Sequence, residues 1–281
     1  MVTTAHNASE WGIEKVDVPA YLDRIGYTGP TDPTLETLTG LQRAHMLSMP
    51  FENLDILFGD GISLDLESIQ DKMVNRGRGG YCHEHNLLFA AVLERIGFTL
   101  TRLLCRIRLG STDVQSRSHS VLIVELGERR YLSDAGYGCL GPLEPIEIAD
   151  GTVSLQDGWE YRIKREGAVT VLQMLNNGSW IDSLGFDTTL FHPVDFQMAN
   201  YLSSTYPRSP MVTGFFAQRV VSTEAGPVRK ALFGTNIQDF TTEGIADQRA
   251  LSTKAEMVSA LRDVIGIRLT DEEIKKIEVI D

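Results

Sequence analysis

The chain has 281 residues, 42% of them hydrophobic and 23% charged, which is enough apolar surface for a globular protein of two or three substructures. A net charge of −12 without any cluster of lysine and arginine argues against a nucleic-acid-binding protein. No apolar run approaches the roughly 18 residues that span a bilayer, the N-terminus lacks the order of a signal peptide, and the three cysteines have no paired spacing, so we expect a reduced, cytoplasmic protein without a membrane segment.

The first third of the sequence predicts helices. An aspartate cap and a proline open a helix over 17–25, which a glycine ends. Leucines at helical spacing predict a second helix over 34–48, which ends before a proline. A short helix over 66–73 and a strongly apolar helix over 83–96 follow.

From about residue 98 the pattern changes to short strands separated by turn signals. Apolar and β-branched residues dominate the segments 99–109, 119–126, 129–136 and 169–175. Glycine, asparagine and aspartate pairs lie between segments of this kind, as in antiparallel hairpins. We therefore expect an antiparallel, barrel-like sheet rather than a parallel one.

The last third mixes both types of structure. The segment 192–204 predicts a helix, and 211–223 and 227–234 predict two paired strands. A further helix is expected over 256–265. The order is helical, then β, then mixed, with boundaries near residues 97 and 190.

The segment 78–86, RGGYCHEHN, concentrates a thiol, two imidazoles and a carboxylate. Two glycines directly before Tyr81 and Cys82 indicate a tight turn and a close backbone approach at the start of a helix. A thiol at that position lies at the positive end of the helix dipole, which favours the thiolate. Cys82 is therefore a candidate nucleophile, and it requires a base.

Two other interpretations of this segment remain open. In the first, His83 and His85 join His119 in a zinc site, although residues two apart on a helix do not share a face. In the second, Cys82 is a small buried residue and the histidines lie at the surface.

The candidate bases are His6, His45, His83, His85, His119 and His192. Among these, His119 opens a predicted hairpin with the two-residue loop Gly127-Glu128. That loop sets His119 opposite Gly136 and brings Asp134 onto the same face as a diagonal neighbour. The pattern predicts a nucleophile, base and orienting acid in Cys82, His119 and Asp134. His85 stays a minor alternative base, and Asp134 has the alternative role of a turn residue.

Four motifs now resemble those of one family, the arylamine N-acetyltransferases. They are RGGYCHEHN, the single histidine in SRSHSVLIV, DAGYG and MPFENLD, in segments 78–86, 116–124, 134–138 and 49–55. The resemblance implies an α+β multidomain fold with a cysteine-protease-like catalytic core. Its parts would be an N-terminal helical bundle that carries the nucleophile (1–97), a central antiparallel β-barrel that carries the base and its carboxylate (98–190), and a C-terminal α/β lid (191–281).

The resemblance also implies transfer of acetyl from acetyl-CoA, as cosubstrate and without a metal, to an aromatic amine, hydrazine or hydroxylamine. Cys82 would carry the acetyl group, with His119 as base and Asp134 as its partner. Phe51 would line the arylamine pocket. Gly136 and Tyr137 would lie beside the bound thioester, where the family often has phenylalanine in place of Tyr137. Arg78 and Glu52 resemble structural members of their motifs.

Other functions and several details stay open at this point. The same three residues could serve a cysteine hydrolase, an amidase or peptidase, and a non-enzymatic binding module would need their geometry to be accidental. Ser116, Arg117 and Ser118 are candidate contacts for the phosphates of coenzyme A or members of a solvated loop. The preferred amine, the acyl chain length and whether the protein forms a homo-oligomer are not determined.

Overall fold

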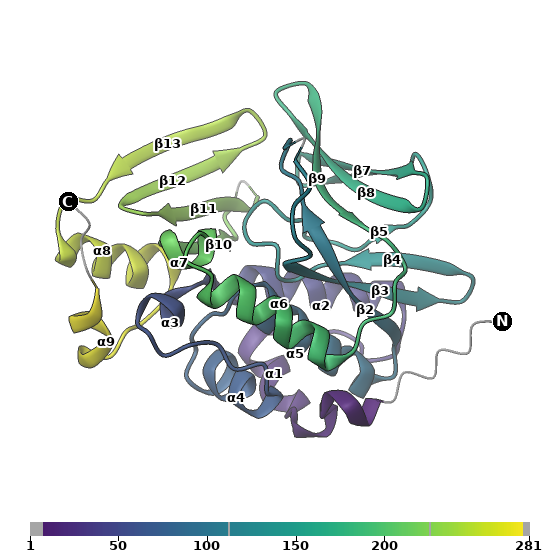
Figure 1. Ribbon diagram of the computed structural model, residues 1–281, viewed down its shortest axis with the longest axis horizontal. Coiled ribbons are helices and arrows are strands. Elements are labelled where there is room, and N and C mark those ends of the chain that lie inside the picture. The colour runs from purple at the N-terminus through teal and green to yellow at the C-terminus, as the bar shows by residue number, and fades with distance from the viewer. Residues whose placement is uncertain (1–7, 112, 225, 278–281) are drawn as a thin grey trace.

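The computed structural model of the protein describes residues 8–111, 113–224 and 226–277. It has α+β architecture, as the sequence predicts, with helices, an eight-stranded sheet and a five-stranded sheet. In Figure 1 the N-terminal helices lie below the two sheets. His6 lies outside the described residues. Within the described part of the chain, no helix combines the length and apolar character needed to cross a membrane.

The N-terminal part is helical because local caps and apolar spacing agree. The side chains of Asp17 and Thr34 accept the first free N–H groups of two helices, from Ala20 at 3.1 Å and Thr37 at 3.2 Å. Gly97 ends the last helix in the left-handed conformation. The four predicted helices are confirmed as α1, α2, α4 with η3, and α5, and three short helices that the sequence did not predict, η1, η2 and α3, are added. They are η1 (Ala8–Trp11), η2 (Ile13–Lys15), α1 (Val18–Ile25), α2 (Leu35–Ser48), α3 (Leu54–Leu57), α4 (Leu66–Gln70), the π-helix η3 (Asp71–Asn75) and α5 (Cys82–Ile96).

The central strands form an antiparallel sheet in the order β5-β4-β3-β2-β9-β8-β7-β6. The side chain of Gln156 at one edge bonds the backbone of Glu144 near the other edge, at 2.9 and 3.1 Å, so the barrel is nearly closed. Leu126 pairs with Arg129 across the two-residue loop, which confirms the predicted register. The strands are β2 (Thr99–Ile107), β3 (His119–Leu126), β4 (Arg129–Ser133), β5 (Ile146–Glu147), β6 (Val153–Gln156), β7 (Trp159–Glu166), β8 (Val169–Asn176) and β9 (Ser179–Phe186).

The C-terminal part builds the second sheet, in the order β1-β10-β11-β12-β13. The edge strand β1 (Phe51–Glu52) belongs to the helical third, and the sequence did not predict it because two residues show no alternation. The predicted pairing of β10 with β11 is confirmed. The remaining elements are α6 (Pro193–Thr205), α7 (Pro210–Thr213), β10 (Phe216–Val221), β11 (Val228–Phe233), β12 (Asn236–Thr241), β13 (Gly244–Ala250), α8 (Lys254–Ala260), the π-helix η4 (Leu261–Ile265) and α9 (Asp271–Lys276).

A buried chain of hydrogen bonds joins three of the N-terminal helices to β1. The Tyr21 hydroxyl lies 2.7 Å from His45 Nδ1, His45 Nε2 lies 2.7 Å from His85 Nδ1, and His85 Nε2 lies 3.1 Å from the carbonyl oxygen of Pro50. A carbonyl only accepts, so His85 donates to Pro50, His45 donates to His85, and Tyr21 donates to His45. Both histidines are therefore neutral. Next to Pro50, the Phe51 ring is stacked parallel to His85.

We expect this neutral pair to make the fold sensitive to acid. Burial lowers the pKa of His85 from 6.5 to about 4, so below pH 6.5 the unfolded chain binds a proton that the folded chain excludes. His85→Gln keeps one donor and one acceptor. It should remove about 2 kcal/mol of the loss in unfolding free energy between pH 6.5 and pH 4.5. Urea unfolding followed by circular dichroism measures this loss. His192→Gln at the exposed His192 is the control, and parallel curves for His85→Gln and wild type would contradict the expectation.

Candidate active site

Cys82 is the first residue of α5, and tight backbone packing holds it there. The N–H of Tyr81 donates to the Glu84 carboxylate at 2.9 Å, which caps the helix. A Cβ atom on Gly79 would lie 2.1 Å from the carbonyl oxygen of Pro50, so only glycine fits. The close approach predicted from the two glycines is therefore present. Cys82 is 7% exposed, at the positive end of a 15-residue helix.

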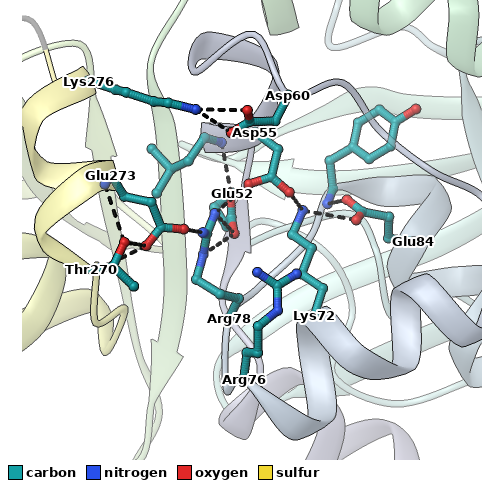
Figure 2. Close-up of polar contacts among 12 residues, drawn as sticks. Glu52, Asp55, Asp60, Lys72, Arg76, Arg78, Glu84, Thr270, Glu273 and Lys276 are labelled. Atoms are coloured by element: carbon teal, nitrogen blue, oxygen red, sulfur yellow. Dashed lines mark hydrogen bonds and ion pairs between the residues drawn. The ribbon is translucent and has the colours of Figure 1, made fainter.

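A buried ion cluster anchors the loop before Cys82 (Figure 2). The Arg78 guanidinium bonds Glu52 at 2.8 Å and Asp55 at 2.9 Å, and it also bonds Glu273 of α9. Burial opposes the charge on Arg78, but these carboxylates outweigh it and raise the pKa of Arg78. The contacts of Arg78 and Glu52 are those of structural residues.

Lys72 is the second cation of the cluster and reaches the cap of α5. Its ammonium lies 2.7 Å from Asp55 and 2.9 Å from Glu84. Burial would lower the pKa of Lys72, but the surrounding carboxylates raise it, so the ammonium stays charged. Glu84 therefore links the ion cluster to the helix that begins with Cys82 (Figure 2).

The hairpin β3–β4 brings His119 and Asp134 together. His119 Nε2 lies 2.7 Å from the Oδ2 atom of Asp134, which is fully buried. This contact confirms the neighbourhood predicted from the loop length. Burial alone would lower the pKa of His119, but the Asp134 carboxylate and the Cys82 thiol outweigh burial and raise it to about 10. The pairing with Asp134 therefore favours the imidazolium form of His119 and occupies Nε2, while the Cys82 sulfur lies 3.8 Å from the carbonyl oxygen of Ser118.

Asn86 completes this arrangement, although its role was not predicted from the sequence. Its amide nitrogen donates to Asp134 Oδ1 at 2.9 Å and to the carbonyl of Ser120 at 2.7 Å. Its oxygen accepts the N–H of Ala135 at 2.9 Å. Its position in the sequence could have indicated this role, because Asn86 lies four residues after Cys82 and shares its helix face.

Within the described residues, none of His45, His83, His85 and His192 forms a hydrogen bond with the Cys82 thiol. His85 uses both ring nitrogens in the chain to Pro50, which contradicts its role as an alternative base. His83 is buried between the rings of Tyr81 and Phe196, so the interpretation of His83 and His85 as surface residues is wrong. Burial lowers the pKa of His83 to about 3. Across the described residues, no cluster of three or more histidine, cysteine and acidic side chains is arranged to hold a metal.

Cys82 and His119 open into a cavity of about 790 Å³. Its walls include all three residues expected to contact substrate, which are Phe51, Gly136 and Tyr137. A Cβ atom on Gly136 would lie 2.5 Å from the carbonyl oxygen of Cys82, so this position also requires glycine.

The hydroxyl of Tyr137 is bound by the protein. The Ser183 hydroxyl on β9 donates to it at 2.6 Å. The Tyr137 ring meets His119 edge-on with 5.4 Å between the ring centroids. Of the residues considered for coenzyme A, Ser116 and Ser118 line the cavity, whereas Arg117 pairs with Asp187 at 2.5 Å.

An α+β fold in which a thiol shares an apolar cavity with an imidazole that is hydrogen-bonded to a buried carboxylate has the geometry of a thiol-dependent acyl-transfer enzyme. A family model described as N-acetyltransferase matches residues 34–274. The chain belongs to the arylamine N-acetyltransferase family.

The chain is similar to individual members of this family over most of its length. The arylamine N-acetyltransferase of Mycobacterium tuberculosis is 34% identical over 262 residues, which cover 91% of this chain and 91% of the relative. The solved structure of the Mycobacterium abscessus enzyme is 32% identical, with a TM-score of 0.88 over 95% of both chains. The structure of the Mycobacterium marinum enzyme in complex with CoA is 35% identical, with a TM-score of 0.83 over 89% of this chain and 93% of the other.

Asn86→Ala should lower both stability and turnover. The substitution removes the side-chain partner of the Ala135 N–H and one donor each to the Ser120 carbonyl and the Asp134 carboxylate, and we expect a loss of about 2–4 kcal/mol in the free energy of unfolding. Thermal unfolding and steady-state rates measure the two effects. Asn176→Ala on β8, where no side-chain hydrogen bond is present in the described residues, is the control. Equal stability of Asn86→Ala and this control would contradict the role of Asn86.

Proposed function

We propose that this protein transfers the acetyl group of acetyl-CoA to the nitrogen of an aromatic amine or hydrazine through a thioester on Cys82. The observation that carries the proposal is the order of the three groups. Cys82 and His119 line the cavity, while the buried Asp134 carboxylate bonds His119 Nε2 at 2.7 Å. Family membership and the complex of the M. marinum relative with CoA support the donor.

In the first half-reaction the Cys82 thiolate attacks the thioester carbonyl of the donor. A new sulfur–carbon bond forms on Cys82, and the bond from the acetyl carbon to the sulfur of coenzyme A breaks. The departing thiolate takes the proton of the His119 imidazolium and leaves as the free thiol. Asp134 favours the imidazolium form of His119 before this step. Its hydrogen bond with His119 Nε2 also keeps that nitrogen turned away from the sulfur.

In the second half-reaction the amine attacks the acetyl group on Cys82. The nitrogen–carbon bond forms as the bond to the Cys82 sulfur breaks, and His119 accepts the proton that the nitrogen loses. The amide leaves, and the thiolate–imidazolium pair is restored. Phe51, Gly136 and Tyr137 would border the acceptor, because all three share the cavity with the thiol.

We extend the proposal to a division of the chain into a helical domain (1–97), a β-barrel domain (98–190) and an α/β lid (191–281) around a cysteine-protease-like core. The helices up to Ile96 and the strands from Thr99 to Phe186 are consistent with the first two. Support for a lid comes from Phe216 and Phe233 of the second sheet, which line the same cavity. Such a cover would exclude water from the acetylated thiol.

A cysteine hydrolase would use the same thiol and base, and the acceptor distinguishes the two functions. The predominantly apolar side chains around the thiol favour an aromatic acceptor over water. A hydrolase would release coenzyme A at full rate without an amine, whereas the transferase requires one.

Incubation with acetyl-CoA alone should add one acetyl mass to the protein, on the peptide that contains Cys82. Cys105 and Cys139 are buried, and burial raises the pKa of each, so neither supplies thiolate near neutral pH. Intact-mass and peptide mass spectrometry locate the label. Initial rates at several fixed amine concentrations should give parallel double-reciprocal plots. A label on Cys105 or Cys139, or one that persists in Cys82→Ala, would overturn the assignment.

Asp134→Asn should lower turnover severely while the fold persists. Without the carboxylate, the pKa of His119 falls from about 10 toward its ordinary value, so the imidazolium disappears near neutral pH and no longer supports the thiolate. In a serine-protease triad the same change costs about four orders of magnitude, and we expect a smaller loss for a thiol. Iodoacetamide alkylation of Cys82 between pH 6 and pH 8 should slow. Unchanged alkylation and turnover in a folded variant would reduce Asp134 to a turn residue.

A further inference from the structure

A tight turn over residues 138–141 directly follows Tyr137, which lines the cavity that contains Cys82. Gly138 has a left-handed backbone with a φ of 85°, and the N–H of Gly141 donates to the Gly138 carbonyl at 3.1 Å. A Cβ atom on Gly141 would lie 2.6 Å from the Cβ atom of Tyr137, so the turn folds back against this residue. The position of the Tyr137 ring therefore depends on how the 138–141 turn is held.

Arg229 on β11 binds this turn from the second sheet. Its Nη1 atom donates to the carbonyl of Cys139 and, at 2.8 Å, to the carbonyl of Gly141. From β7 of the barrel, the Tyr161 hydroxyl donates toward the carbonyls of Leu140 and Gly141, each at 3.0 Å. Three successive backbone carbonyls of the turn are thus bound by two buried side chains from different sheets.

Arg229 is an expensive residue at this place. It is 1% exposed, yet no ion pair to it forms within the described part of the chain. Its guanidinium lies over the Trp159 ring at 4.0 Å, and its Nε and Nη2 atoms have no hydrogen-bond partner among the described residues. Burial of a cation without a carboxylate is costly, and here the ring and two carbonyls are what offset the cost. A residue placed against the stability of a fold often serves its function.

The face of the second sheet that binds the turn also reaches the cavity. Gln218 on β10 lies opposite Ala231, two residues from Arg229, so Gln218 and Arg229 share a face. Gln218 lines the cavity, and its Oε1 atom accepts the N–H of Cys139 at 2.9 Å. A Cβ atom on Gly138 would lie 2.4 Å from that oxygen, so this side chain packs directly on the turn.

Tyr137 is the residue through which the turn affects the site. Ser183 bonds the hydroxyl at the far end of its side chain, whereas the turn fixes the backbone at the near end. His119, which the Tyr137 ring meets edge-on, is held separately by Asp134, and Asp134 is held by Asn86 of α5. A displaced turn would therefore move one wall of the cavity and leave the base in place.

We propose that Arg229 is a positioning residue for acceptor selectivity, which holds the 138–141 turn so that Tyr137 presents its ring to an aromatic amine. The inference deepens the proposed function and rests on it. Arg229 is not among the described residues that line the cavity, so it acts through the turn and not on the substrate. An aromatic acceptor needs the Tyr137 ring beside it, whereas an acceptor without a ring does not.

Arg229→Met tests the inference, because methionine keeps an apolar contact with Trp159 but donates no hydrogen bond. Its KM for aniline should rise about fivefold with kcat unchanged, the effect of one lost aromatic contact. Its kcat/KM for hydrazine, which has no ring, should match wild type. Its rate of Cys82 acetylation by p-nitrophenyl acetate should also match, because this ester reacts before any amine binds. Steady-state rates and the burst of p-nitrophenol measure these values.

Arg102→Met is the matched control. Arg102 is also buried, at 3% exposed, and lies over a tryptophan, Trp11, but it bonds Glu94 at 3.0 Å rather than the turn. Its loss should lower the unfolding temperature and leave the ratio of aniline to hydrazine rates at the wild-type value. A rise of the aniline KM in Arg102→Met equal to that in Arg229→Met would overturn the inference. A uniform loss with both acceptors in Arg229→Met would do the same, and would reduce Arg229 to a structural residue.

Tyr161→Phe loosens the same turn without removing a charge. It takes the hydroxyl from the carbonyls of Leu140 and Gly141 and keeps the ring, so we expect it to fold even where Arg229→Met does not. Its KM for aniline should rise about twofold, with hydrazine unaffected. An aniline KM at the wild-type value in a folded Arg229→Met, or in Tyr161→Phe when Arg229→Met does not fold, would contradict the inference.

A double-mutant cycle tests whether Arg229 acts through Tyr137. Tyr137→Ala alone should raise the KM for aniline, and the addition of Arg229→Met should raise it no further. Effects of the two substitutions that simply multiply would show independent action and overturn the inference.

Failure of the proposed function gives a different result. A wild-type protein that p-nitrophenyl acetate acetylates on Cys82, but that passes acetyl to neither aniline nor hydrazine, would overturn the proposed acceptor and this inference with it. Transfer to both amines, with the same aniline KM in Arg229→Met as in wild type, would overturn the inference alone.

Discussion

Three hydrogen bonds converge on the buried carboxylate of Asp134, and the relation between α5 and the β3–β4 hairpin depends on them. Their donors are the His119 ring, the Asn86 side chain and the backbone N–H of Gly136. A carboxylate left unpaired in the interior would cost several kcal/mol, so the two segments pack stably only when all three donors are present. The same packing sets the carbonyl of Cys82 against Gly136, where no Cβ atom fits. The position of the sulfur relative to the imidazole follows from this arrangement.

Two different buried polar systems pack behind Cys82 and the cavity wall. A neutral chain through His45 and His85 ends on the carbonyl of Pro50, directly before Phe51 in the cavity wall. An ionised cluster around Lys72 and Arg78 supports the loop before Cys82 and the cap of α5 (Figure 2). The neutral chain tolerates no extra proton, whereas the ionised cluster depends on keeping its charges. Acid therefore threatens the site by protonating the neutral chain through His45 and His85. Loss of any single charge threatens it by leaving the cluster around Lys72 and Arg78 unbalanced.

The cavity combines apolar walls with an absence of acidic residues, although the chain as a whole is strongly acidic. Apolar walls exclude water, which would strengthen the proposed ion pair between Cys82 and His119. The lack of carboxylates spares an anionic donor the repulsion that it meets elsewhere on the surface. The candidate reacting groups Cys82 and His119 thus lie in one cavity whose described lining residues include no carboxylate.

Local patterns in the sequence determined the helices and the hairpin register, because caps, apolar spacing and loop length act within about ten residues. Short sequence motifs determined the likeness to one enzyme family. The two-residue loop was enough to set Asp134 beside His119. Only the tertiary structure decided which distant groups satisfy one another. Asn86 meets Asp134 across 48 residues, His45 meets His85 across 40, and β1 pairs with β10 from the opposite end of the chain. Such partners are chosen by how whole segments pack, since a buried polar group accepts any donor that packing brings within reach, and no local pattern records which one that is.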